Sequence, residues 1–171
     1  MNGETITDKP GRNVVLLVGA PEMTVTWSRY GPGERGPDLH VHREHTDAFY
    51  VLEGELTFEL GPAPETVRLG AGGFAAVPLH VAHAFRNDGD ADARWFNVHA
   101  PDKGFAEFMR GQREGIPLPW DSFDVPEDGG LPADAVTLTE SGGADLPGLR
   151  VRPEGALVVV EAAGKVVEFR V

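Results

Sequence analysis

The stretch HVHREHTDAFYVLEGEL, from His40 to Leu56, places three of the chain's six histidines within six residues. Alternate side chains of a β-strand point the same way, so His40 and His42 project from one face of one strand. Asp47 opens the next strand-like run after the short link REHT, and Gly54 permits the tight turn before Leu56. The stretch therefore predicts two antiparallel strands that bring two imidazoles and a carboxylate together.

Strand-like runs continue on both sides of this stretch, separated by turn sequences such as GPGERGP, GPAPE and NDGDAD. The chain contains 22 glycines and 14 prolines, which is too many for a helix bundle. Strands at such short intervals predict an all-β sandwich or barrel. The expected strands are Val14–Val18, Met23–Tyr30, Leu39–His42, Ala48–Leu52, Leu56–Leu60, Glu65–Leu69, Phe74–Val77, Ala84–Arg86 and Arg94–His99.

The pattern changes after residue 100. One helix is predicted from Asp102, a candidate N-cap, and from apolar residues at helical spacing, namely Phe105, Phe108 and Met109. The Pro/Gly-rich segment that follows carries Trp120 and Phe123, which a disordered linker would rarely contain. We therefore expect these two aromatic residues to pin the segment to the body as an ordered strap or lid.

The two ends of the chain differ in pattern. Residues 1–12 are polar, and we expect them to be loose or donated as a strand to a neighbour. The C-terminal GALVVVEAAGKVVEFRV predicts two strands around Ala162–Lys165, which extend a sheet or pack on a partner subunit. No linker separates a second domain. We expect one domain over residues 1–171, with a barrel core at about 13–100, the helix and strap at 101–135 and C-terminal strands at 136–171.

Composition narrows the classes of function. The chain has 171 residues, enough for a sizeable core, and its lack of cysteine excludes disulfides and thiolate metal sites and favours a reducing compartment. A formal net charge of −12 opposes binding to nucleic acid. The apolar run Val14–Ala20 is too short to span a bilayer. We expect a cytoplasmic protein whose partner is a small molecule, not a membrane or a nucleic acid.

A fourth candidate ligand lies about forty positions after Asp47, in GGFAAVPLHVAHAFRN. His83 in this stretch joins His40, His42 and Asp47 if two antiparallel strands and a third neighbour converge inside a barrel. Three neutral imidazoles and one carboxylate suit one divalent transition metal ion, with Fe, Ni, Cu, Mn, Co and Zn all left open. An octahedral ion held by four such ligands keeps two positions for substrate oxygen or O2.

The residues also carry a family resemblance. The first stretch resembles the first motif of the cupin superfamily, and the second stretch resembles the second motif; the matching positions are Gly36, His40, His42, Asp47 and Gly54, then Gly72, Pro78, His83 and Asn87. The resemblance covers roughly residues 23–100. It implies a jelly-roll β-barrel (a double-stranded β-helix), a metal held by His40, His42, Asp47 and His83, and a homodimer. It includes quercetinase-like cupins, which keep three histidines and a carboxylate at these spacings.

Two positions depart from the cupin motifs. Asp47 stands where the family has Glu, one methylene longer, so Asp47 either binds the metal directly, binds through water, or acts beside the ligands. His80 stands where the family has Gly between Pro78 and His83. His45 is expected to be a bystander in the short link, although it is within reach of the barrel mouth. His99, at a strand end, faces either the cavity or the surface.

The expected cavity is lined by aromatic residues and by histidines outside the ligand set. Its predicted lining residues are Phe49, Phe58, Phe74, His80, Phe85 and His99, and the phenylalanines are also expected in the barrel core.

The expected activity is that of a metal-dependent dioxygenase acting on a small aromatic or enolisable substrate, with Asp47 as the catalytic base. A redox-neutral isomerase or lyase working at the same metal is an alternative. A non-catalytic protein that binds or senses a small molecule or a metal is another.

Overall fold

The computed structural model describes residues 2–171. The strands are β1 (Glu4–Lys9), β2 (Arg12–Ala20), β3 (Met23–Tyr30), β4 (His40–Val41), β5 (Thr46–Glu53), β6 (Glu55–Leu60), β7 (Glu65–Gly70), β8 (Phe74–Val77), β9 (His83–Arg86), β10 (Ala93–Ala100), β11 (Phe123–Asp124), β12 (Thr137–Thr139), β13 (Ala144–Leu146), β14 (Leu149–Glu154), β15 (Leu157–Ala162) and β16 (Lys165–Arg170). The helices are α1 (Phe105–Glu114) and a short 3₁₀ helix, η1 (Ala133–Ala135). The nine strands predicted up to residue 100 correspond to β2–β10, and the all-β fold class is confirmed.

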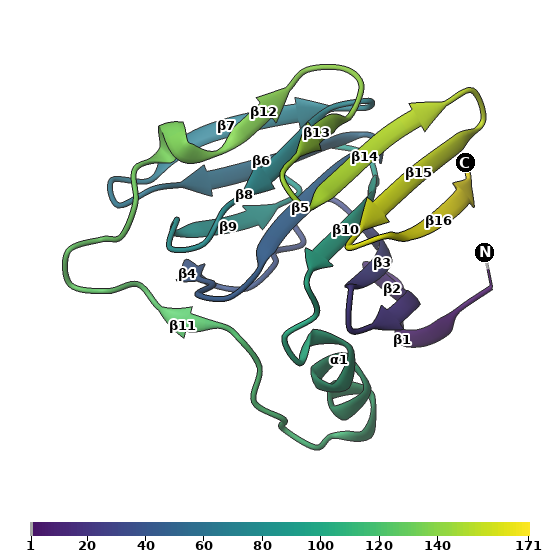
Figure 1. The fold of residues 1–171 in the computed structure, drawn as a ribbon, viewed down its shortest axis with the longest axis horizontal. Coiled ribbons are helices and arrows are strands. Elements are labelled where there is room, and N and C mark those ends of the chain that lie inside the picture. The colour runs from purple at the N-terminus through teal and green to yellow at the C-terminus, as the bar shows by residue number, and fades with distance from the viewer. Residues whose placement is uncertain (1) are drawn as a thin grey trace.

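Two antiparallel sheets form the jelly-roll barrel (Figure 1). The larger sheet has the strand order β1-β2-β3-β10-β5-β8-β12, and the smaller has the order β11-β4-β9-β6-β7. Apolar side chains on the facing sides of these sheets form the barrel core, in which the rings of Phe49 and Phe58 lie 5.0 Å apart. Sequence neighbours pair within hairpins, and strands distant in sequence pair across the barrel, as β3 does with β10.

Strand register brings the predicted ligands together. His40 on β4 is paired with His83 on β9, although the two residues are far apart in sequence. In the larger sheet, Asp47 on β5 is paired with His99 on β10. The two pairs lie in the two facing sheets, so their side chains meet across one end of the barrel interior.

The C-terminal strands form a third sheet instead of extending the barrel. Strands β13-β14-β15-β16 form a four-stranded sheet that lies beside the larger sheet in Figure 1. Its apolar residues pack against the outer face of the larger sheet, where the Phe96 and Phe169 rings are 4.8 Å apart. The predicted hairpin around Ala162–Lys165 is confirmed as β15–β16, and within this chain it packs on the chain's own barrel.

The N-terminal segment is not loose where the structure describes it. Strand β1 pairs with β2 of the same chain, and Glu4 forms an ion pair with Arg110 of α1, 2.6 Å between Oε1 and Nη2. The expectation of a loose or donated segment was therefore wrong for residues 4–9, because β2 leaves an edge with which β1 pairs. Met1 lies outside the described residues.

One motif glycine is explained by a close approach. A Cβ atom on Gly36 would lie 2.6 Å from Cε2 of Phe85, a core aromatic residue. Only glycine leaves room for the ring there, which accounts for the residue at the start of the first motif.

The predicted helix is α1, which lies at the lower edge of the barrel in Figure 1. The carboxylate of Asp102 accepts hydrogen bonds from the amides of Phe105, at 2.8 Å, and Ala106, at 3.4 Å. Asp102 thus caps the first turn as predicted, although Gly104 occupies the N-cap position itself. Within the described chain, no helix combines the length and apolar character needed to cross a membrane.

Candidate metal centre

Three buried imidazole rings point their Nε2 atoms toward one another. The Nδ1 atom of each ring forms a hydrogen bond with a backbone carbonyl oxygen. The partners are the oxygen of Asp38 for His40, at 2.9 Å, that of Asp121 for His42, at 2.6 Å, and that of Val81 for His83, at 3.0 Å. A carbonyl only accepts, so each Nδ1 carries the proton and each neutral ring keeps a lone pair on Nε2. Such second hydrogen bonds fix the orientation of metal-binding histidines.

The three rings offer ligand atoms that lie within 4.8 Å of one another. The Nε2 atom of His42 is buried and has no hydrogen-bond partner among residues 2–171. A buried polar atom without a partner is costly, so this one requires an explanation. A cation between the three nitrogens would supply it.

Asp47 reaches two rings of the cluster from the opposite sheet. Its Oδ2 atom lies 3.2 Å from Nε2 of His83 and 3.6 Å from Nε2 of His42. Its Oδ1 atom accepts a hydrogen bond from the Asn97 side-chain amide and lies 3.6 Å from Nε2 of His99. One carboxylate oxygen thus faces the imidazole cluster, while the other is held by a neighbouring amide.

Burial sets the charges at the site. Loss of solvent, together with the nearby His83 and His42, lowers the pKa of His40 to about 3. Burial alone would raise the pKa of Asp47, but the adjacent His99 and the contacts with His42 and His83 outweigh burial and hold that pKa well below its usual range. A neutral imidazole beside an ionised carboxylate is the donor set that a divalent transition metal prefers.

The contact between Asp47 and His83 also indicates that a positive charge belongs between these side chains. Because Nδ1 of His83 already donates to a backbone oxygen, its Nε2 lone pair faces a carboxylate oxygen that also carries lone pairs. This contact is favourable only with a positive charge between the atoms, either a second ring proton or a metal ion that replaces that proton. The residues present therefore fit a metal ion.

A second histidine cluster adjoins the first, and sequence reasoning missed it. His42, His45 and His99 also offer ligand atoms within 4.8 Å of one another. Nδ1 of His45 lies 2.7 Å from Oδ2 of Asp121, and Nε2 of His45 lies 2.9 Å from Nδ1 of His99. Burial lowers the pKa of His45 to about 4 and lowers that of His99 well below its usual range. His45 is therefore fully buried at the site and not a bystander in the link.

One signal in the sequence pointed to His99. Asn97 and His99 alternate on one strand and therefore share a face, just as His40 and His42 do. In the structure both residues line the cavity, and Nε2 of His99 lies 3.2 Å from Oδ1 of Asn97. No comparable signal identified Asp121, which reaches the site from far along the chain.

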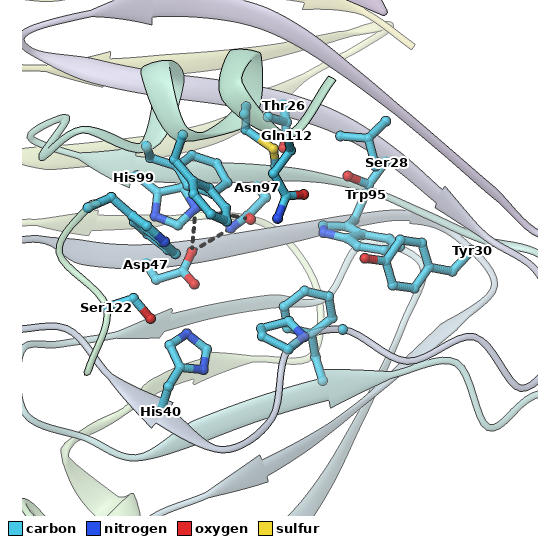
Figure 2. A pocket seen from close by; sticks show the side chains of 18 of the residues that line it. Thr26, Ser28, Tyr30, His40, Asp47, Trp95, Asn97, His99, Gln112 and Ser122 are labelled. Atoms are coloured by element: carbon cyan, nitrogen blue, oxygen red, sulfur yellow. Dashed lines mark hydrogen bonds and ion pairs between the residues drawn. The ribbon is translucent and has the colours of Figure 1, made fainter. Parts of the chain in front are cut away.

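Two of the metal-ligand candidates, His40 and Asp47, line one end of a cavity of about 340 Å³. Figure 2 shows His40, Asp47 and His99 toward one side of this cavity and Trp95, Tyr30 and Ser28 toward the other. The second side is aromatic, since the Tyr30 and Trp95 rings meet edge to face at 4.8 Å. The space suits a small molecule with an apolar ring and a polar end.

Two of the six residues predicted to line this cavity do so, namely Phe85 and His99. Phe49 and Phe58 are instead fully buried in the barrel core, where each packs against other apolar residues. Phe74 points to the opposite face of the larger sheet and packs under the C-terminal sheet. Strand alternation places Phe74 on the outer face of the larger sheet. Phe49 and Phe58 point inward, but other core side chains such as Phe85 cover them.

His80 lies on the surface and away from the ligand cluster. Its backbone has a φ of 67°, a left-handed conformation that glycine adopts without strain. Its amide donates to the carbonyl oxygen of His42, and its own carbonyl accepts from the amide of Leu131. The family glycine at this position thus reflects backbone geometry, and the histidine here replaces it without entering the site.

The predicted strap is ordered and covers the ligand cluster. Trp120 lines the cavity, and its ring lies 5.1 Å from the His42 ring and 4.7 Å from the Phe105 ring. Phe123, the second predicted anchor, is 39% exposed and packs beneath the guanidinium of Arg43 on the outer surface. Trp120 therefore anchors the strap inward, while Phe123 only lies over a surface residue.

A family model described as a cupin domain matches residues 26–99. The chain is 34% identical over 83 residues to the quercetin 2,3-dioxygenase of Bacillus subtilis (strain 168), an alignment that covers 46% of this chain and 24% of that protein. It is 35% identical over 79 residues to the polyketide synthase CurC of Streptomyces cyaneus, covering 46% of this chain and 49% of that protein. KdgF from Halomonas sp. superposes with a TM-score of 0.52 at 22% identity, covering 60% of this chain and 91% of that chain.

Residues 26–99 thus match a cupin domain, and this part of the chain shares its fold with KdgF. The predicted jelly-roll barrel is confirmed by the match in fold to KdgF. These alignments span between a quarter and a half of the two curated relatives.

Proposed function

We propose that the protein is a metal-dependent cupin in which His40, His42, His83 and Asp47 hold one divalent transition metal ion. The observation that carries this proposal is the buried Nε2 atom of His42, which lacks a partner and faces Oδ2 of Asp47 at 3.6 Å. The matched Nδ1 hydrogen bonds of the three rings support it, because they leave all three Nε2 lone pairs free for one ion.

The reaction we propose is a dioxygenase-like oxidation of a small aromatic or enolisable substrate. The aromatic cavity wall formed by Tyr30, Phe85 and Trp95 supports an aromatic substrate, and one relative is named a quercetin 2,3-dioxygenase. A bound metal ion supplies Lewis acidity and, if it is redox-active, a path to O2. Asp47 is the only carboxylate among the described residues that line the cavity, which supports its role as acceptor of a substrate hydroxyl proton.

A redox-neutral reaction at the same site is the second candidate. It is favoured by the other relative, which is named a polyketide synthase and not an oxygenase. An isomerase or lyase would use the same cavity and the same proton acceptor without consuming O2. A binding protein without catalysis would use the cavity alone, and homodimer formation, which sedimentation velocity would measure, is compatible with each of these functions.

The first experiment is the metal content of untagged protein purified without added metal, measured by elemental mass spectrometry. About one Fe, Ni, Cu, Mn, Co or Zn per chain is expected, because the donor set accepts each of these ions. Oxygen uptake with quercetin then separates the reactions: uptake supports the dioxygenase, and turnover without uptake supports the redox-neutral reaction. Protein that contains no metal and takes up none of these ions would contradict the proposed function.

A further inference from the structure

The strap that follows α1 contacts the same residues that form the candidate metal centre. Strand β11 pairs with β4, so that Asp124 lies opposite His40 and Phe123 lies opposite Val41. The backbone carbonyl of Asp121 accepts the Nδ1 hydrogen bond of His42 at 2.6 Å. The strap therefore extends the strand that carries His40, and it supplies the partner that orients the ring of His42.

The side chain of Asp121 fixes this arrangement. It is only 5% exposed, although it belongs to a segment with few buried residues. Its carboxylate accepts hydrogen bonds from the backbone amides of Arg43, at 3.0 Å, and Glu44, at 2.8 Å, and from Nδ1 of His45 at 2.7 Å. These partners belong to the turn between His42 and Asp47, so one carboxylate ties the strap to the loop that joins two candidate ligands.

Trp120 and the start of α1 hold the strap from the other side. The Trp120 ring stacks on Phe108 at 5.1 Å and lies 5.9 Å from the His45 ring. The amide of Asp121 donates to the carbonyl oxygen of Lys103 at 3.1 Å. By contrast, Ile116 is 50% exposed, and the chain up to residue 119 is exposed as well. The strap is thus held at Trp120 and Asp121 and by a two-residue strand, and little else in it is buried.

We propose that Asp121 is a positioning residue that couples docking of the strap to metal binding at the centre. This inference rests on the proposed metal site and goes beyond it, because it assigns a role to a residue outside the cupin domain match. When the strap is docked, its carbonyl holds His42 with Nε2 toward the metal. When the strap is displaced, His42 and His45 lose their partners together, and the ligand set loses its geometry.

Linkage makes the coupling reciprocal. If docking of the strap raises metal affinity by some factor, metal binding favours the docked strap by the same factor. A segment with so few buried contacts opens at low free-energy cost, so its opening should be measurable by amide exchange. The same opening would uncover the cavity, because Trp120 and Ser122 line it. Metal loading is therefore expected to close the cavity as well as to complete the catalytic centre.

The test compares D121A and D121N with D124N in the full chain. Asp124 lies in the same strap, is exposed and has no side-chain hydrogen bond or ion pair among residues 2–171, so D124N is a matched control. Zn²⁺ affinity is measured by competition with a chelator, and amide exchange over residues 116–124 and 40–47 is measured by mass spectrometry with and without Zn²⁺. Circular dichroism checks that each variant is folded, and D121N retains a side chain of the same shape if D121A does not fold.

Zn²⁺ is expected to slow exchange of the strap in the wild type and in D124N. In D121A we expect the strap to exchange rapidly with or without Zn²⁺, and Zn²⁺ affinity to fall about ten- to hundredfold, the usual effect of removing a residue that orients a metal ligand. Equal Zn²⁺ affinity in wild type and D121A would overturn the coupling and leave the proposed function intact. Failure of the wild type to bind Zn²⁺ or any other divalent transition metal would overturn both.

Discussion

Replacing Asp47 with Asn tests whether this carboxylate is a metal ligand, because the change keeps the shape of the side chain and removes its charge. In the metal-free protein the Asn amide would donate to Nε2 of His83 across the 3.2 Å contact that now joins two acceptors. The change would also remove the cost of burying an ionised carboxylate, so it exchanges an unfavourable contact for a hydrogen bond. We therefore expect the metal-free variant to be at least as stable as the metal-free wild type.

In the presence of Zn²⁺, the variant should be less stable than the wild type. Loss of a direct ligand should lower Zn²⁺ affinity by more than the roughly ten- to hundredfold that follows loss of a residue beside a ligand. With free Zn²⁺ well above the dissociation constant, a hundredfold loss removes about 2.7 kcal/mol of the stabilisation that the ion provides. For a chain of this size that loss corresponds to a Tm lower by about 5–11 °C.

The assay is thermal unfolding of wild type and D47N, each with excess chelator and with a fixed excess of Zn²⁺. D90N is the control, because Asp90 is exposed and has no side-chain partner among residues 2–171. The expected pattern is an unchanged or higher Tm without metal and a much smaller Zn²⁺-dependent rise. A Zn²⁺-dependent rise equal to that of the wild type would show that Asp47 is not a ligand. A large loss of stability without metal would refute the argument from facing lone pairs.

Three further variants test other parts of the structure. His83→Ala should abolish tight Zn²⁺ binding in the chelator assay, and full metal occupancy in this variant would contradict the barrel geometry. Gly36→Ala should destabilise the protein by about 1–3 kcal/mol in chemical denaturation, because the added Cβ lies 2.6 Å from the Phe85 ring; unchanged stability would mean that the ring moves freely. His80→Gly should relieve the left-handed backbone at no cost to metal affinity, and weaker Zn²⁺ binding would place His80 in the site after all.

Periodicity predicted the barrel because each of its strands is a local feature. The alternation of His40 and His42, the turn at Gly54 and the apolar runs on either side are all visible within a few residues. The strands β2–β10 follow these signals closely. Strands β11–β14 were not predicted individually, because they lie in Pro/Gly-rich sequence and depend on pairing with distant partners.

Only the site residues that belong to a local sequence pattern were predicted. His40, His42, Asp47 and His83 were found because their spacing in sequence follows strand alternation and the cupin motifs. The structure brings these four side chains together, while their role as metal ligands remains a prediction that the zinc experiments test. His45 was misjudged because a histidine in a short polar link carries no periodic signal, and its burial depends on Asp121 from the strap. The partner of a buried polar group can come from any part of the chain, so local sequence cannot identify it.

The position of Asp47 explains how a side chain one methylene shorter than glutamate can serve this site. The carboxylate of Asp47 has a fixed orientation, because its Oδ1 atom accepts a hydrogen bond from the Asn97 side-chain amide and lies 3.6 Å from Nε2 of His99. His99 is in turn bonded to His45, and His45 to Asp121. The shorter reach is thus accompanied by a buried hydrogen-bonded chain that fixes the direction of the carboxylate. A carboxylate fixed in this way loses little conformational freedom when an ion binds, which favours a rigid metal site over a flexible one.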